Sequence, residues 1–275
     1  MTAEPTYRGF ALDAETALAL LQWQAELGAD EPCLDAPLDR YAMPDRAEAR
    51  PAAAPAAAPA TGPRDQARDL VRDEARDLVA HAEALAAGAT TLDELAAAQE
   101  AFDGIELKKG ARNFCFCDGN PAARVMIIGE APGEEEDRQG RPFVGRAGQL
   151  LDQMFGAIGL SRQAVDAERA LYITNVLTWR PPGNRRPEPA EIAMMLPFLM
   201  RHVELVQPQL LVLMGNTPCI AALNRQGILK LRGNWTQAFG LPALPMAHPA
   251  YLLRTPLAKR EAWADLLSLS ARLEG

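Results

Sequence analysis

Four short apolar runs in the second half of the chain alternate with longer segments of helical periodicity. The runs are 124–128 (RVMII), 171–177 (LYITNVL), 209–214 (QLLVLM) and 243–247 (ALPMA). β-Branched residues mark the first three runs most clearly, as is typical of buried strands. Helical patterns fill the intervening segments 147–158, 189–206, 217–224 and 256–273. The alternation predicts an α/β fold: a three-layer α/β/α sandwich around a short, largely parallel, four-stranded central sheet.

The first part of the chain follows a different pattern. Residues 1–41 include an amphipathic stretch, 11–27, whose apolar positions predict a short helix. Residues 42–64 contain PAAAPAAAPATGP, a tract without core periodicity that is typical of a semi-extended linker.

Residues 65–104 are predicted to form a helical extension. The pentapeptide ARDLV occurs twice, eight residues apart, and its Leu and Val residues share one helix face. Thr91 and Glu94 have the spacing of a capping box for a helix over 92–102. Residues 105–275 remain as the domain that carries the candidate chemistry.

Acidic and basic residues are distributed unevenly along the chain. The whole chain has a formal net charge of −8, which argues against a non-specific nucleic-acid binder. Residues 1–104 hold 20 acidic and 8 basic side chains, whereas 105–275 hold 16 acidic and 20 basic. Five of those 16 acidic residues lie within 130–137, so the rest of this domain has a surplus of positive charge suited to phosphate contacts.

Composition also indicates the class of protein and the cellular compartment to expect. Hydrophobic residues make up 48% of the chain, enough for a sizeable core, but no apolar run is long enough to span a membrane. The first ten residues lack the pattern of a secretory signal. Four cysteines do not make a disulfide scaffold and favour a reducing cytosol.

Distinctive motifs follow three of the predicted strands, at the sheet edge where α/β proteins bind ligands. GEAPGEEED (129–137) and GRPFVG (140–145) follow the first strand. The second strand ends with Asn175 and is followed by WRPPGNRR (179–186), and HPAYLLR (248–254) follows the fourth. The acidic run on its own is typical of a solvated helix start, and a lone His is more often structural than catalytic.

Together, in this order and on these strand ends, the motifs closely resemble the uracil-DNA glycosylase superfamily, and best its family 4, the bacterial and archaeal iron–sulfur type. The resemblance covers about residues 105–273. It implies a catalytic domain at 105–275, a monofunctional glycosylase that flips uracil out of DNA and hydrolyses its N-glycosidic bond. The products would be free uracil and an abasic site, as in base excision repair. We expect a monomer in the bacterial cytosol or nucleoid.

The resemblance also assigns roles to residues. Glu130 would orient the attacking water or stabilise the oxocarbenium-like sugar, and His248 would stabilise the charge that develops on uracil O2. Phe143 would stack on the base, Asn175 would read its edge, and Glu136 would crowd C5 and exclude thymine. Gly129, Ala131 and Gly133 would complete the substrate loop. Leu252, Leu253 and Arg254 would enter the duplex, with Arg180 and Arg185 on the DNA; core packing is the alternative for the two leucines.

The chain departs from family 4 at the cluster. Members hold a [4Fe–4S] cluster on four cysteines, whereas the matching positions here are Phe102, Ile105, Trp179 and Met195. We therefore expect no metal and no cofactor, with these side chains filling the volume; a relocated [4Fe–4S] cluster is the alternative. The cysteines present are Cys33, Cys115, Cys117 and Cys219.

Two further possibilities concern the chemistry. A related branch that forms a covalent adduct has a His-containing insertion after the second motif, and residues 183–187 here contain no His. A covalent mechanism is therefore disfavoured. Loss of the cluster leaves an alternative function open, a catalytically degenerate DNA-binding module that senses uracil or damage.

Overall fold

A computed structural model describes residues 6–7, 10–11 and 63–274 of the chain. Chain contacts divide it into two units, residues 1–60 and 61–275. In the first unit, β1 (Thr6–Tyr7) pairs antiparallel with β2 (Phe10–Ala11). Ala11 is therefore a strand residue, and the rest of the helix predicted over 11–27 lies outside the described residues, as does the linker up to residue 62.

The second unit is built around a six-stranded sheet with the order β3-β5-β4-β6-β8-β7. The four central strands are parallel, and the edge strands β3 and β7 are antiparallel to their neighbours. The strands are β3 (Cys117–Gly119), β4 (Val125–Gly129), β5 (Leu171–Asn175), β6 (Leu210–Met214), β7 (Thr236–Ala238) and β8 (Leu241–Met246).

This sheet confirms the predicted α/β sandwich and its four parallel strands, but the predicted number of strands was too small. The two edge strands are each three residues long, and β3 reads CDG and β7 reads TQA. Neither has the apolar, β-branched composition on which the prediction relied, because an edge strand is held by pairing on one side only.

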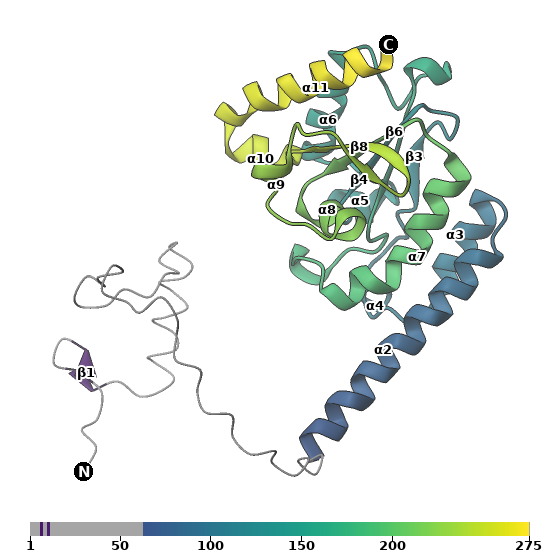
Figure 1. The fold of residues 1–275 in the computed structure, drawn as a ribbon, viewed down its shortest axis with the longest axis vertical. Coiled ribbons are helices and arrows are strands. Elements are labelled where there is room, and N and C mark those ends of the chain that lie inside the picture. The colour runs from purple at the N-terminus through teal and green to yellow at the C-terminus, as the bar shows by residue number, and fades with distance from the viewer. Residues whose placement is uncertain (1–5, 8–9, 12–62, 275) are drawn as a thin grey trace, which may run out of the picture. The chain divides into compact units, whose positions relative to one another are not determined.

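Helices cover both faces of the sheet (Figure 1). The α-helices are α2 (Pro63–Gly88), α3 (Leu92–Ala101), α4 (Leu107–Gly110), α5 (Glu134–Gln139), α6 (Arg146–Gly156), α7 (Pro189–Val206), α8 (Asn216–Leu223), α9 (Ile228–Leu231), α10 (Pro249–Arg254) and α11 (Lys259–Glu274). Short 3-10 turns span Ala167–Arg169, Pro182–Asn184 and Pro256–Ala258. None of the helices among residues 63–274 is both long and apolar enough to cross a membrane.

Alternate residues of the central strands supply two separate cores. In β4, Met126 and Ile128 join the core beneath α2, α3 and α7, whereas Val125 and Ile127 join the core beneath α6, α10 and α11. All four side chains are fully buried. The period of two in a strand explains this division, because successive side chains point to opposite faces of the sheet.

The helices before residue 105 pack on the same unit as the sheet. Ala82 and Ala86 of α2 and Leu95 of α3 are buried in the core that α7 shares with the sheet. The predicted capping box starts α3: Glu94 N donates to Thr91 Oγ1 at 3.2 Å, and Thr91 N donates to Glu94 Oε2 at 3.2 Å. α2 and α3 thus extend one face of the sandwich.

Candidate active site

The candidate site lies where the four parallel strands end. Gly129 closes β4, Asn175 closes β5, Gly215 follows β6, and His248 follows β8 after Ala247. Parallel strands bring their carboxyl ends to one edge of the sheet, so residues more than 100 positions apart meet there. The structure therefore brings together the three predicted strand-end motifs.

Gly129, Phe143 and Asn175 are in close contact. A Cβ placed on Gly129 would lie 2.3 Å from Asn175 Oδ1 and 2.4 Å from Phe143 Cε2, so only glycine fits at this position. Asn175 is 4% exposed, and its Oδ1 has no hydrogen-bond partner among residues 63–274. A buried carbonyl oxygen without a donor is costly, and it is therefore a strong candidate to accept a hydrogen bond from a ligand.

The aromatic ring of Phe143 faces the imidazole of His248. The two ring centroids are 5.4 Å apart, with an angle of 28° between the planes. Gly215, with φ of 106°, lies behind His248, where an added Cβ would be 3.4 Å from the His248 Cβ. The two rings form one wall of the site beside the Asn175 amide.

His248 is a neutral imidazole with a defined tautomer. It is the N-cap residue of α10, and its Nδ1 accepts a hydrogen bond from Ala250 N at 3.1 Å. Burial lowers the pKa of His248 to about 4, aided by the charge of Arg254 and opposed by that of Glu136. Because Nδ1 is an acceptor, the proton of the neutral ring is on Nε2, which is left as a donor.

Glu130 is held by a residue that the sequence did not single out. Thr217 Oγ1 donates to Glu130 Oε2 at 2.6 Å, and Thr217 is 5% exposed in the first turn of α8. The turn after β6 is the one parallel-strand end for which no functional residue was predicted. Its position alone could have indicated Thr217, because all four strand ends meet at the site.

Glu136 connects the two halves of the loop around the site. Its Oε2 accepts from Gly133 N at 3.1 Å, and its Oε1 accepts from Val144 N at 2.9 Å and Gly145 N at 2.8 Å. The Glu136 carboxylate is thus occupied by three backbone donors. Gly133 is the N-cap residue of α5, and Ala131, half-buried, packs against the core under α7.

Phe143 has an unusual backbone conformation that its neighbours maintain. Its φ is 54°, in the left-handed region that costs a non-glycine residue on the order of 1–3 kcal/mol. Gly148 packs so closely that an added Cβ would lie 1.8 Å from Phe143 O. Arg162 Nη2 donates to the same carbonyl oxygen at 2.8 Å. Neither Gly148 nor Arg162 was predicted, because both act through the backbone carbonyl of Phe143 and belong to none of the recognised motifs.

The three residues predicted to enter DNA have different environments. Leu252 is fully buried in the core beneath α6 and α11, so its prediction as a wedge into the duplex was wrong. It lies on the inner face of α10, three residues after the buried Pro249. Leu253 is 37% exposed and Arg254 is exposed, so these two are on the side of α10 that solvent reaches.

Arg180 and Arg185 are both engaged within the protein. Arg180 Nε donates to Asn184 Oδ1 at 2.8 Å, and its Nη2 lies 3.8 Å from Glu134 Oε2. Arg185 forms a two-point pair with Glu191 at the start of α7, with N···O distances of 3.0 and 2.6 Å. A phosphate contact by Arg185 would compete with this pair.

The positions matched to the cluster cysteines of family 4 form an apolar quartet: Phe102, Ile105, Trp179 and Met195. All four are buried in the core shared with α7, with 0–6% of their surface exposed. The Phe102 and Phe198 rings lie 5.6 Å apart, and the Trp179 and Phe114 rings lie 5.0 Å apart. These side chains offer no thiolate to an iron ion.

The described cysteines do not supply a replacement set of ligands. Among the side chains of residues 76–274, no three Cys, His, Asp or Glu residues are grouped as metal ligands. Burial raises the pKa of Cys115 and Cys219 to about 12, and burial also raises that of Cys117, so the thiolate that iron requires is disfavoured. Cys33 lies outside the described residues. The described residues of this unit do not fit a [4Fe–4S] cluster.

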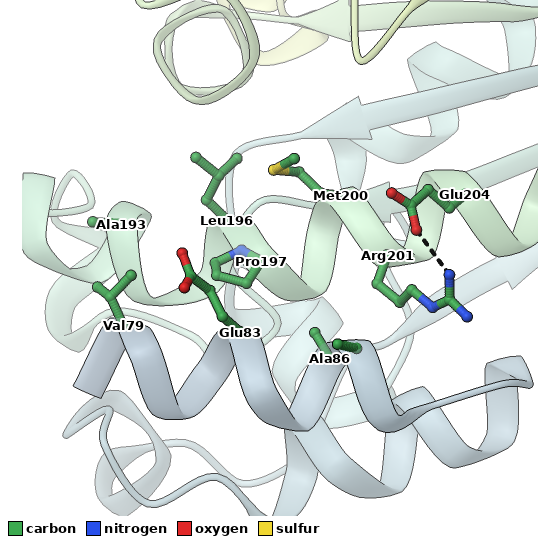
Figure 2. Close-up of a pocket in the computed structure, with 10 residues that line it drawn as sticks. Val79, Glu83, Ala86, Ala193, Leu196, Pro197, Met200, Arg201 and Glu204 are labelled. Carbon is green, nitrogen blue, oxygen red and sulfur yellow. Dashed lines mark hydrogen bonds and ion pairs between the residues drawn. The ribbon is translucent and has the colours of Figure 1, made fainter. Parts of the chain in front are cut away.

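An apolar groove between α2 and α7 is separate from these motifs. Figure 2 shows its lining, which includes Val79 and Ala86 of α2 and Leu196 and Met200 of α7. The polar side chains there include Arg201 and Glu204, which pair at 2.8 Å. None of the predicted site residues lines this groove, so it is not the candidate active site.

Comparison with known proteins agrees with the geometry. The family model of the uracil DNA glycosylase superfamily matches residues 116–267. The chain is 42% identical over 147 residues to the type-4 uracil-DNA glycosylase of Thermotoga maritima, spanning 52% of this chain and 72% of that protein. The type-4 enzyme of Sulfurisphaera tokodaii is 40% identical over 149 residues, 50% of this chain and 65% of that protein.

A third type-4 uracil-DNA glycosylase, from Archaeoglobus fulgidus, is 34% identical over 171 residues, which span 58% of this chain and 82% of that protein. The resemblance to family 4 drawn from the motifs is thereby confirmed. The family model covers β3 to the first half of α11, the part of the chain that forms the sheet and its strand-end site. The chain belongs to the uracil DNA glycosylase superfamily.

Proposed function

We propose that this chain is a monofunctional uracil-DNA glycosylase that takes uracil out of the DNA stack and hydrolyses its N-glycosidic bond. The reaction leaves free uracil and DNA with an abasic site, the first step of base excision repair. The observation that carries the proposal is the unpaired Asn175 Oδ1 beside the Phe143 and His248 rings. Similarity to type-4 enzymes supports the same activity.

Asn175 would select the base. Uracil presents a donor at N3 and an acceptor at O4, which match the Oδ1 acceptor and the Nδ2 donors of the amide. Cytosine presents the reverse pattern and would leave the buried amide unsatisfied, which disfavours its binding. Phe143 would stack on the face of the base, and the Glu136 carboxylate would hold the loop that carries this ring.

His248 would stabilise the leaving base. As the glycosidic bond breaks, the electron pair moves onto the uracil ring and negative charge develops at O2. A neutral imidazole with its proton on Nε2 is a preorganised donor for this charge, since Nδ1 is already bonded to Ala250 N. The donor is fixed before the reaction, so little reorganisation is required.

Glu130 would act on the sugar side. Thr217 holds Oε2, whereas Oε1 has no hydrogen-bond partner among residues 63–274 and is available to a water molecule. The carboxylate would orient that water toward the anomeric carbon and stabilise positive charge on the sugar. No protein nucleophile is required, so the abasic site is released without a covalent adduct.

We also propose that the enzyme works without a cofactor. The apolar quartet fills the core where the resemblance would place cluster ligands, and no step above requires iron. The purified protein is expected to lack the absorption band that iron–sulfur clusters show near about 400 nm. Stoichiometric iron in the freshly purified protein would contradict this proposal.

An oligonucleotide containing one uracil tests the function. Wild-type protein should release uracil and leave an abasic site that breaks only on alkali treatment, whereas oligonucleotides with cytosine or thymine should stay intact. Glu130→Ala should lose activity, and Glu134→Ala is the matched control because Glu134 is an exposed carboxylate of the same loop. Binding to uracil-containing DNA without base release would favour a damage-sensing module instead.

A further inference from the structure

We infer that Arg162 is a positioning residue for the base-stacking ring of Phe143; this inference rests on the proposed function. Arg162 lies in the turn between α6 and β5, and its side chain is only 8% exposed. It does not contact the strand ends where the base would bind. Its guanidinium instead lies against the backbone of the loop that presents Phe143.

The guanidinium connects three parts of the unit. Nη1 donates to Pro142 O at 3.0 Å, and Nη2 donates to Phe143 O at 2.8 Å, so the loop is held through consecutive carbonyl groups. Nη1 also donates to Asp118 Oδ2 at 3.0 Å, and Nε donates to Asp152 Oδ1 at 2.8 Å. Arg162 therefore ties the loop to strand β3 and helix α6.

Only an arginine can make this set of contacts. The guanidinium is planar and has five N–H donors in a fixed fork, so it can bond two carbonyl oxygens and two carboxylates at once. A lysine has one nitrogen and cannot reach all four acceptors with good geometry. Asp118 and Asp152 fix the fork and balance its charge, so the donors remain directed at the loop.

These contacts bear on the site because Phe143 is held in a conformation it would not adopt alone. Its positive φ requires neighbours that fix the backbone on both sides. Glu136 accepts from Val144 N and Gly145 N on one side, and Arg162 donates to Pro142 O and Phe143 O on the other. With both anchors, the ring stays between Gly129 and His248.

Loss of Arg162 should release the ring without removing any group that would touch the base. Arg162→Gln is expected to reduce single-turnover uracil release on the order of 100-fold, because small misplacements of substrate-positioning groups have effects of this size. It should also raise the inhibition constant of free uracil. Affinity for DNA with an abasic site should stay close to wild type, since that ligand has no base to stack. The rate of uracil release by Arg162→Lys should lie between those of wild type and Arg162→Gln.

Arg124→Gln is the matched control. Arg124 is also largely covered and bonds Gln209 Oε1 at 2.8 Å and Leu273 O at 2.8 Å, but it lies just before β4, at the opposite end of the sheet from the site. The Arg124→Gln substitution should lower the melting temperature of the protein without slowing uracil release. Amide hydrogen exchange at Val144 and Gly145 should accelerate in Arg162→Gln and not in Arg124→Gln.

The outcomes separate the two proposals. If wild-type protein releases no uracil, the proposed function fails, and the role of Arg162 fails with it. If wild type is active and Arg162→Gln is no slower than Arg124→Gln, only the positioning role is overturned. Should Arg162→Gln not fold, Asp118→Asn replaces it: this change weakens one anchor of the fork and should give the same pattern at smaller amplitude, and unchanged uracil release would overturn the role.

Discussion

Two histidines, the half-buried His248 of the site and the buried His202 of the core, have the same charge state and different surroundings. Burial lowers the pKa of His248 to about 4 and that of His202 to about 3, so both rings are neutral near pH 7. His202 is stacked on Phe116 at 4.4 Å, and its Nε2 is 2.8 Å from the Tyr172 hydroxyl. His248 uses Nδ1 within the protein and leaves Nε2 as a donor. Since the pKa of both rings is lowered and each has one ring nitrogen bonded within the protein, it is the position of His248 at a strand end, facing Phe143, that distinguishes the candidate site histidine from the core histidine.

Two unpaired polar atoms on one segment of the chain allow a similar comparison between the site and the core. Asn175 Oδ1 and Trp179 Nε1 are both buried without a hydrogen-bond partner in the described part of the chain. Asn175 lies at the strand end beside Phe143, where a base could supply the missing donor. Trp179 belongs to the apolar quartet and packs against Phe114. An unpaired atom indicates a ligand site only where other ligand-binding groups converge on it.

Removal of a large side chain from the apolar quartet should have the greatest effect on stability. Phe102→Ala is expected to lower the free energy of unfolding by about 3–5 kcal/mol, as for other fully buried aromatic residues. Uracil release by the folded fraction should be unchanged, because the quartet takes no part in the proposed mechanism. Urea denaturation and single-turnover kinetics measure both. Trp263→Ala, at a half-exposed aromatic on α11, should cost much less stability.

The two histidines should respond oppositely to substitution. His248→Ala is expected to lower the rate of uracil release on the order of 100- to 1,000-fold, the effect of removing a preorganised donor to developing negative charge. His202→Ala should instead lower stability and leave the rate of the folded protein intact. Equal losses of rate in both variants would break the distinction between the site and the core.

Acid should destabilise the protein through both rings. Each histidine has a lower pKa when folded than the ordinary value of 6.5, so the unfolded chain binds more protons below that value. Stability from this source is therefore complete above about pH 6.5 and is lost as pH falls toward 4 for His248 and 3 for His202. Over the pH range between its unfolded and folded pKa values, each ring lowers the free energy of unfolding by up to about 1.4 kcal/mol for each unit by which the pH falls. Denaturation at several pH values should show less acid sensitivity in His202→Gln.

Asn175→Asp should change selectivity more than stability. The variant loses the amide donor for uracil O4, which is worth about 1–3 kcal/mol when a buried partner is left unsatisfied. We expect weaker discrimination between uracil and cytosine, measured as the ratio of release rates from two matched oligonucleotides. An unchanged ratio would count against Asn175 as the residue that reads the base.

Trp179→Phe should have the smallest effect. The change removes the unpaired Nε1 donor and keeps an aromatic ring against Phe114, so stability is expected to change by less than about 1 kcal/mol, or to rise slightly. Thermal denaturation would detect the shift. A large loss of stability would mean that the indole nitrogen has a structural role.

The sequence predicted the parts of the fold that depend on local pattern. The apolar runs identified the four parallel strands, and the Thr91 capping box identified the start of α3. The edge strands were missed because Cys117–Gly119 has no strand-like composition and pairs only through its position beside β5. Tertiary contacts, rather than propensity, determine such short elements.

The site was predictable where one residue follows one strand and not where several segments meet. Glu130 and His248 each follow a predicted strand, and Asn175 ends one. The role of Arg162 depends on contacts with β3, α6 and the Phe143 loop, which are brought together only in the folded protein. The burial of Leu252 depends on which face of α10 packs against the core. Neither fact can be read from the motif that contains the residue.

Gly129 is the point of closest packing in the candidate site. Its backbone is the floor on which the Asn175 amide and the Phe143 ring rest, and a single methyl group there would overlap both. Gly129→Ala would therefore displace the Asn175 amide and the Phe143 ring, while every charged and hydrogen-bonding side chain of the site is retained. A single added carbon would thus disturb two groups that are proposed to hold the base, although it removes neither of them.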